Sequence, residues 1–362
     1  MGLAPARVPQ LVAVGFDDNS RSGLDASGGG VQWAVDMARG LKNPQGRGQS
    51  ANADDTSVRL SFYMASTCID AGAAFGETRV VESPITVKRA WRAALEEGHE
   101  IGNHTHTHAH GSAFAAAEWR REIERCTDRL STPFDGEEAP DRPNPTSGIG
   151  VATSELHGFR APYLEYNDAL FGAVKALDFR YDCSVEDGWQ AGMDGTNYHW
   201  PYTLDGGCPA VAALTPHPGL WELPAHPVIV PPDDRCEQYG VPPGLRRKLR
   251  GVSSHFDEQS GKITGFDYNL WVAFRMTKAE FLATLKYSLD LRRQGNRAPF
   301  LLGAHTDYYS SDYMDAPNAT APERRAAMEE FLAYALSQPE IRVASLKQVL
   351  DWVRNPVPIA ND

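Results

Sequence analysis

Apolar and polar residues alternate along the chain in two distinct ways. Short apolar runs of strand length are separated by longer segments in which apolar residues recur at the helical period. The runs predict strands at 11–17, 58–65, 100–103, 158–161, 179–184, 220–224, 299–304 and 341–345. The periodic segments predict helices at 31–41, 86–97, 113–130, 168–177, 278–294, 322–336 and 346–354.

This order of elements predicts an α/β fold with parallel strands. Eight strands interleaved with helices favour a distorted or incomplete (β/α) barrel. An open doubly wound sheet is the alternative. No Gly-x-Gly-x-x-Gly motif stands at a strand–helix junction, which disfavours the nucleotide-binding version of that sheet.

Four connections are long and rich in Gly, Pro, Asn and Asp. Connections of this length in a compact domain are usually functional or disordered. They cover 43–57, 133–157, 187–219 and 231–270. We therefore expect a single catalytic domain over 11–354 with long active-site loops, and flexible termini at 1–10 and 355–362.

The charge of the chain limits its partners. The composition, with 42% hydrophobic and 23% charged residues, is typical of a soluble globular protein. The net charge of −12 argues against nucleic acid, polyanionic substrates and anionic membrane surfaces, and it favours a neutral or cationic partner. No stretch approaches the ~18–20 apolar residues of a membrane helix, so no membrane insertion is expected. The first ten residues contain no apolar signal-peptide core. The oligomeric state is unknown from the sequence.

The five cysteines do not indicate a thiolate metal site, because none lies in a Cys-x-x-Cys pattern. Cys208 and Cys236 flank a Pro-rich stretch, where a disulfide would restrain an insertion. We state this pairing as a hypothesis. The odd count leaves at least one thiol without a partner in the chain.

Four histidines stand within seven residues, at positions 104, 106, 108 and 110. On a helical turn, residues i and i+4 share a face about 40° apart, so two such imidazoles can chelate one metal ion. On an extended strand they would lie about 13 Å apart. Both His104–His108 and His106–His110 have this spacing. A solvated polar turn or an incidental His-rich metal binder is the alternative.

Further polar groups stand where predicted strands end. Asp17 and Asp18 end the first strand, and adjacent strand residues point to opposite sides, so one carboxylate can bind a metal while the other faces elsewhere. The other strand ends carry Asn103-His104, Arg160 to Tyr163, Asp182 to Glu186, and His305. Active sites of α/β barrels form at the carboxyl ends of the strands. The sequence thus predicts one site that collects these groups.

This combination resembles the polysaccharide deacetylases of the NodB-homology class, carbohydrate esterase family 4. Five ordered motifs carry the resemblance: Phe16-Asp17-Asp18-Asn19, His104 to His108, Arg160-Ala161-Pro162-Tyr163, Asp182 with its following residues, and Leu302-Gly303-Ala304-His305. Two motifs depart from the family pattern. Asn19 stands where the first motif usually ends in Gly, and Glu186 stands where the fourth normally has Trp. Trp189 or Trp221 is a candidate to supply the missing hydrophobic wall.

The resemblance implies a role for each motif residue. Because the strand before the second motif leads into its first histidine, His104 and His108, with Asp18, are the implied ligands of one divalent ion. Zn²⁺ suits this set, and Co²⁺, Ni²⁺ or Mn²⁺ are alternatives. Asp17 is the implied general base on water and His305 the implied general acid. The remaining roles are Arg160 orienting Asp17, Asp182 orienting Arg160, the Tyr163 N–H stabilising the oxyanion, and Leu302 lining the methyl pocket.

The resemblance also implies the activity. We expect metal-dependent N-deacetylation of a carbohydrate polymer or oligomer that contains N-acetylglucosamine, such as chitin, chito-oligosaccharide or peptidoglycan, with release of acetate. Alternatives on the same fold are O-deacetylation of xylan and hydrolysis of a non-sugar amide. An inactive carbohydrate-binding protein is the alternative of a different class. The family leads us to expect a secreted or periplasmic protein, with a signal peptide removed from this chain.

Overall fold

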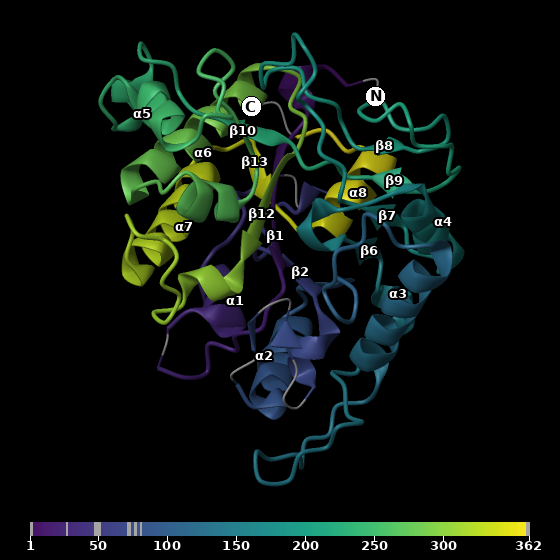
Figure 1. The fold of residues 1–362 in the computed structure, drawn as a ribbon. Helices are drawn as coiled ribbons and strands as arrows, with labels where there is room; N and C mark the ends of the chain where they lie inside the picture. The colour runs from purple at the N-terminus through teal and green to yellow at the C-terminus, as the bar shows by residue number, and fades with distance from the viewer. Residues whose placement is uncertain are drawn as a thin grey trace.

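A curled, mostly parallel sheet runs through the centre of the molecule, and helices surround it (Figure 1). The computed structural model describes residues 3–26, 28–46, 52–70, 74–75, 78–79 and 82–359. The sheet order is β12-β1-β2-β5-β6-β7-β9-β8, and β13 also pairs with β1. The strands are β1 Gln10–Asp17, β2 Ser61–Met64, β5 Glu100–Asn103, β6 Gly158–Phe159, β7 Tyr181–Asp182, β8 Tyr202–Thr203, β9 Trp221–Glu222, β12 Phe300–His305 and β13 Ile341–Val343.

The sheet is an incomplete barrel, as the sequence predicts. Neighbouring strands from β12 through β9 are parallel, and only β8 runs antiparallel, against β9. Among the described residues, no strand pairing joins β12 to β8, so the barrel stays open between them. All eight expected strands form, although β6, β7 and β9 are shorter than expected.

The predicted helices also form. They are α1 Gly30–Arg39, α2 Pro84–Glu96, α3 Ala116–Ser131, α4 Asp168–Ala176, α6 Lys278–Gln294, α7 Ala321–Leu336 and α8 Leu346–Arg354. At the start of α6, the Thr277 side chain accepts from the Glu280 N–H, and the Glu280 carboxylate accepts from the Thr277 N–H. This capping box satisfies two amide groups that helix geometry leaves without partners.

The two long loops after residue 187 contain more structure than the sequence indicates. They hold β8, β11 Lys262–Thr264 and α5 Leu245–Val252, and β11 pairs antiparallel with β10 Pro227–Ile229, which precedes the second loop. The sequence does not signal α5, because only Leu245 and Leu249 are buried in its two turns. A second short pair, β3 Ala74–Phe75 and β4 Thr78–Arg79, is also new.

The proposed Cys208–Cys236 disulfide is wrong. All five cysteines are free and buried. The Cys208 thiol contacts the Tyr202 hydroxyl at 3.3 Å, whereas the Cys236 thiol faces the Pro231 carbonyl at 3.6 Å. Each thiol thus packs as a small apolar group in its own surroundings.

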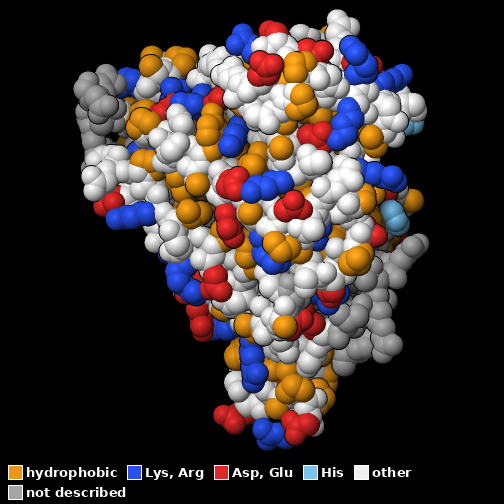
Figure 2. Space-filling view, turned by 90° about the vertical axis from the view of Figure 1, so that its left-hand side faces the viewer, with side chains coloured by type: hydrophobic (Ala, Val, Ile, Leu, Met, Phe, Trp, Pro, Cys, Tyr) orange, Lys and Arg blue, Asp and Glu red, His pale blue; other side chains and the backbone are white. Residues whose placement is uncertain are grey.

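Figure 2 shows basic, acidic and hydrophobic side chains intermingled over the face that it presents. Across the described part of the chain, no helix has the length and apolar character needed to cross a membrane.

The two faces of the sheet have different cores. Val14 and Leu302 face the surrounding helices in the larger core cluster. Ala13, Tyr63 and Leu301 face the inside of the curl, where α8 packs. This division follows from the alternation of side chains along each strand.

A chain of polar groups crosses the inside of the curl. The Tyr63 and Tyr181 hydroxyls lie 2.7 Å apart, and the Tyr181 hydroxyl donates to Glu100 Oε1 at 2.7 Å. The other Glu100 oxygen accepts from the Ser61 hydroxyl and the Lys347 N–H at 2.7 and 2.8 Å. Burial raises the pKa of Glu100, and these donors oppose the rise. Because buried polar groups are costly when unpaired, this chain fixes the Tyr63 ring in one position.

This network makes a prediction for stability. The Tyr181→Phe variant leaves Glu100 Oε1 and the Tyr63 hydroxyl without their shared partner, so the free energy of unfolding should fall by about 1–3 kcal/mol. Urea denaturation followed by circular dichroism measures this change. Tyr268→Phe is the control, because Tyr268 is 47% exposed, and it should change stability by less than about 0.5 kcal/mol. An equal stability of the two variants would contradict the role of the network.

Candidate active site

The carboxyl ends of the strands surround a cavity of about 620 Å³. It lies at the face where α/β barrels place their active sites. The predicted site residues Asp17, Asp18, His104, His108, Tyr163 and His305 all line it. The other lining residues are His110, Leu164, Glu186, Thr264, Phe266, Tyr268, Asn269 and Tyr308.

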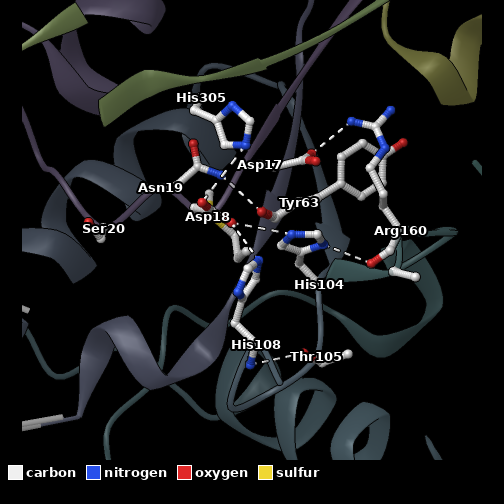
Figure 3. A network of polar contacts seen from close by, with 12 residues as sticks. Asp17, Asp18, Asn19, Ser20, Tyr63, His104, Thr105, His108, Arg160 and His305 are labelled. Carbon is white, nitrogen blue, oxygen red and sulfur yellow. Dashed lines mark hydrogen bonds and ion pairs between the residues drawn. The ribbon is translucent and has the colours of Figure 1, made fainter. Parts of the chain in front are cut away.

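A turn at the end of β1 separates the two adjacent carboxylates. Asp18 and Asn19 both have left-handed backbone angles, with φ of 70° and 64°. Asn tolerates this region better than most residues. Its side-chain amide also donates to the carbonyls of Phe16 and Tyr63, each at 3.0 Å. These bonds explain how Asn19 can replace the Gly expected here. Figure 3 shows the result: Asp17 faces Arg160, and Asp18 faces the histidines.

The histidine segment is an irregular turn with two left-handed residues rather than the helical turn considered from the spacing. Thr105 and His108 have φ of 65° and 54°, and the Thr105 hydroxyl accepts from the His108 N–H at 3.2 Å. The turn still brings both imidazoles to Asp18. Asp18 Oδ1 lies 3.3 Å from His104 Nε2 and 3.1 Å from His108 Nε2. The i, i+4 spacing therefore indicated the correct pair of histidines, although the backbone between them is not helical.

Hydrogen bonding sets the tautomer of His104. Its Nδ1 lies 2.7 Å from the Arg160 carbonyl, which can only accept, so Nδ1 carries the proton. Nε2 then presents its lone pair toward Asp18. An imidazole held by a carbonyl in this way is oriented as a metal ligand.

Asp18, His104 and His108 fit a divalent cation. One ligand atom from each lies within 4.8 Å of the others, and this is the only such group of three among the described residues. Asp18 Oδ1 is buried without a hydrogen-bond partner. Although burial alone would raise the pKa of Asp18, the imidazoles, His108 foremost, hold it well below its usual range. A carboxylate and two imidazoles with room for further ligands is the pattern of a catalytic zinc site.

The other two histidines of the cluster lie apart from this group. His106 Nδ1 lies 2.8 Å from the Ser66 hydroxyl, and its Nε2 lies 2.7 Å from Arg125 Nη2. The His110 side chain is 68% exposed, bonds to Glu165 at 2.9 Å and stacks on Tyr163. Consequently the alternative pair His106–His110 does not converge on a carboxylate.

Arg160 holds Asp17 inside the curl of the sheet. Its Nη1 donates to Asp17 Oδ1 at 2.7 Å, and its Nε donates to the Cys183 carbonyl at 3.3 Å. The guanidinium lies over the rings of Tyr63 and Phe266, at 4.4 and 5.3 Å from their centroids. Burial opposes the charge, but Asp17 keeps the pKa of Arg160 well above its usual value.

Asp182, the residue expected to orient Arg160, reaches the backbone next to it through Ser184. Both of its oxygens accept from Ser184, from the N–H and the hydroxyl, each at 2.9 Å. The Ser184 hydroxyl in turn accepts from the Ala161 N–H at 2.8 Å. Asp182 therefore positions the backbone beside Arg160. Burial raises the pKa of the Asp182 carboxyl group to about 6, although the hydrogen bonds from Ser184 oppose this rise.

His305 has a buried partner that the sequence did not reveal. Asp267 accepts from His305 Nδ1 at 2.7 Å and from its N–H at 2.9 Å. The other ring nitrogen, Nε2, lies on the side of Asp18, 3.9 Å from Oδ2. Burial lowers the pKa of His305, but Asp267, Asp18 and Asp17 outweigh it and raise the value to about 9. The three carboxylates thus favour the protonated form of His305.

Asp267 lies in a segment that crosses the open side of the barrel. Phe266 pairs with Gly303 in an isolated parallel bridge. A Cβ on Gly303 would lie 2.2 Å from the Phe266 ring, so only glycine allows this approach. No motif spacing signals Asp267, because it stands alone between Phe266 and Tyr268. Only the fold brings it to His305.

The predicted substrate-binding residues lie outside the cavity lining. Leu302 is 1% exposed and packs in the core on the helix-facing side of β12. His305 points to the opposite side of the same strand. Trp189 is exposed in its loop, and Trp221 packs against the inner core. The position of the missing fourth-motif Trp carries Glu186, which lines the cavity beside Phe266. Tyr163 does line the cavity, with a left-handed φ of 57°.

Comparison with known proteins agrees with this arrangement. A family model described as polysaccharide deacetylase matches residues 54–139, which include His104 and His108. Chitin deacetylase 8 of Bombyx mori is 24% identical over 215 residues, which are 58% of this chain and 46% of that protein. The fold resembles that of a candidate polysaccharide deacetylase from Mycobacterium smegmatis, with a TM-score of 0.50 and 17% identity over 99% of this chain and 96% of the other. These matches confirm the predicted resemblance and the predicted fold class.

The geometry predicts where a divalent ion binds. Asp18→Asn and His108→Ala should each reduce the bound metal from one ion per chain toward none, because each removes one of three convergent ligands. Mass spectrometry of the dialysed protein measures metal content. His110→Ala is the control and should keep the ion, since His110 faces Glu165. Anomalous scattering that placed the ion on His106 or His110 would contradict this assignment.

Proposed function

We propose that this chain, whose sequence and fold resemble polysaccharide deacetylases, is a metal-dependent hydrolase. It removes N-acetyl groups from oligomers or polymers that contain N-acetylglucosamine, such as chitin or peptidoglycan, and releases acetate. The observation that carries the proposal is one cavity that contains a carboxylate–imidazole cluster together with Asp17 and His305. The single catalytic domain and the extracellular site of action expected from the sequence are part of the same proposal.

The cluster of Asp18, His104 and His108 would hold the ion. A bound divalent ion lowers the pKa of water and polarises a carbonyl group. All three side chains are buried at the cavity wall, so their ligand atoms are held in fixed positions. The Arg160 carbonyl keeps His104 in the ligating tautomer, which prepares the site for Zn²⁺ or a similar ion.

Asp17 is suited to accept a proton from the attacking water. It lines the cavity, is 3% exposed and does not belong to the ligand group. Its bond to Arg160 holds one carboxylate oxygen and leaves the other to act as a base. When the water oxygen adds to the acetyl carbon, its proton passes to Asp17. The Tyr163 N–H, at the cavity wall, would help to stabilise the resulting oxyanion.

His305 is suited to donate a proton to the leaving nitrogen. Asp267 holds its Nδ1, so the proton on Nε2 faces the cavity. The C–N bond then breaks with both electrons on nitrogen, which takes the proton from His305. The products are acetate and a free amine. An amide needs such a donor because an amide anion is a very poor leaving group.

The cavity surface favours a sugar. The rings of Tyr163, Phe266, Tyr268 and Tyr308 line it, and aromatic rings can cover the apolar faces of pyranose residues. An acetylated xylan or a small amide is the second candidate, because the hydrolytic groups would act on either. A purely carbohydrate-binding protein is disfavoured, because both proton-transfer groups and all three ligands are in place.

The proposed function predicts acetate release that depends on both metal and Asp17. Wild type should release acetate from chitin oligomers or peptidoglycan, and a chelator should abolish release until a divalent ion is added back. Asp17→Asn should lower turnover by at least about 10²-fold, the contribution of a general base, while keeping its metal. Enzymatic acetate assays on these substrates, acetylxylan and small amides measure this. Release unaffected by chelation would refute metal dependence, and loss of metal from Asp17→Asn would refute its role as a base.

His305 makes a prediction that compares two substrates. His305→Ala should reduce turnover of a chito-oligosaccharide by the ~10²–10⁴-fold typical of general acid–base catalysis. Hydrolysis of an activated acetyl ester should fall less, since an alkoxide leaves without prior protonation more readily than an amide anion. Equal losses on both substrates would show that His305 acts in binding or oxyanion stabilisation instead.

A further inference from the structure

Glu186 places a carboxylate in the cavity wall where the resemblance predicts an apolar side chain. It lies beyond the end of β7, and its backbone bridges Ala225 after β9. The Thr264 hydroxyl, at the end of β11, donates to Glu186 Oε1 at 2.7 Å. The side chain is therefore held between two backbone segments that form one side of the cavity. Such a fixed carboxylate can only accept hydrogen bonds.

No cationic side chain of the described cavity lining pairs with Glu186. Among the described residues that line the cavity, there is no lysine or arginine. Asp17 has its own partner in Arg160, and Asp18 has His104 and His108. Glu186 makes no ion pair within the described part of the chain, and Thr264 is its only hydrogen-bond donor there. Among the described residues that line the cavity, Glu186 is thus the carboxylate that has no ion-pair partner of its own.

We propose that Glu186 binds a protonated amine of the substrate. The preferred substrate is then a sugar oligomer in which a residue near the acetylated one already carries a free amine, an inference that rests on the proposed deacetylase function. A charge-assisted bond to an ammonium group is roughly twice as strong as a neutral one. Because deacetylation itself produces such amines, each reaction on a polymer creates the group that Glu186 binds.

Two other features of the chain agree with a cationic substrate. The net charge of −12 attracts cations and repels polyanions at long range. In the same cavity, the half-exposed Tyr268 ring can contact an ammonium group or a sugar ring. A phosphate or carboxylate group of a substrate placed next to Glu186 would be repelled by its carboxylate.

The test compares two tetramers of the chitin type at a pH where the sugar amine is protonated. One is fully acetylated, and the other carries a single free amine. Wild type should have the higher kcat/KM on the amine-bearing tetramer. Glu186→Gln keeps an oxygen for Thr264 but removes the charge. It should lose about tenfold or more in kcat/KM on that substrate and less than about threefold on the acetylated one.

Glu258→Gln provides the matched control. It makes the same change of charge at an exposed position outside the cavity, so both kcat/KM values should stay at wild-type levels. Equal losses by Glu186→Gln on the two tetramers, or no loss on either, would overturn the proposal.

A binding measurement separates this proposal from the deacetylase function. If wild type releases acetate from neither tetramer, the proposed function fails, and calorimetry with a fully deacetylated glucosamine tetramer decides the role of Glu186. Binding at least about tenfold weaker to Glu186→Gln than to wild type would support recognition of the amine. Equal affinities would overturn it.

Discussion

Two adjacent carboxylates cannot remain charged in a buried site unless each has a positive or metal partner of its own. This constraint organises the centre of the molecule. Asp17 and Asp18 are 3% and 9% exposed, and ionised groups at such depth are very costly when unpaired. The left-handed turn at Asp18 and Asn19 resolves the conflict by directing one carboxylate toward Arg160 and the other toward two imidazoles. The different partners of the two carboxylates thus follow from an electrostatic requirement.

The position of Arg160 depends in turn on groups far from the cavity. Its guanidinium rests on the Tyr63 ring, and the Tyr63 hydroxyl reaches Glu100 through Tyr181. Glu100 stands at the amino end of its strand and is held by α8. The inside of an open barrel could collapse or admit water. Here a hydrogen-bonded polar chain fills it and holds Tyr63, Arg160 and therefore Asp17 in fixed positions.

Much of this arrangement could be predicted from the sequence, because strong local patterns encode it. Strand β1, helix α6 and the spacing of His104 and His108 are short-range signals, and they indicated the fold class and the group that fits a metal ion. The long-range parts escaped prediction. Asp267 meets His305 across 38 residues, and the register of β12 turns Leu302 away from the cavity. The pattern of residues in a single sequence does not show which residues of a long loop will contact a given strand.

The contact of Gly303 with Phe266 couples two positions that are distant in sequence. Any side chain at 303 would displace the Phe266 ring, and Asp267 is its immediate neighbour. Asp267, the hydrogen-bond partner of His305, would move with it. Evolution of the loop around 266 is therefore constrained by a strand position that does not line the cavity. Among divergent homologues, a larger residue at 303 should coincide with a smaller residue at 266 or with a different partner for the histidine, so this pair of positions records whether the Asp267–His305 contact has been kept.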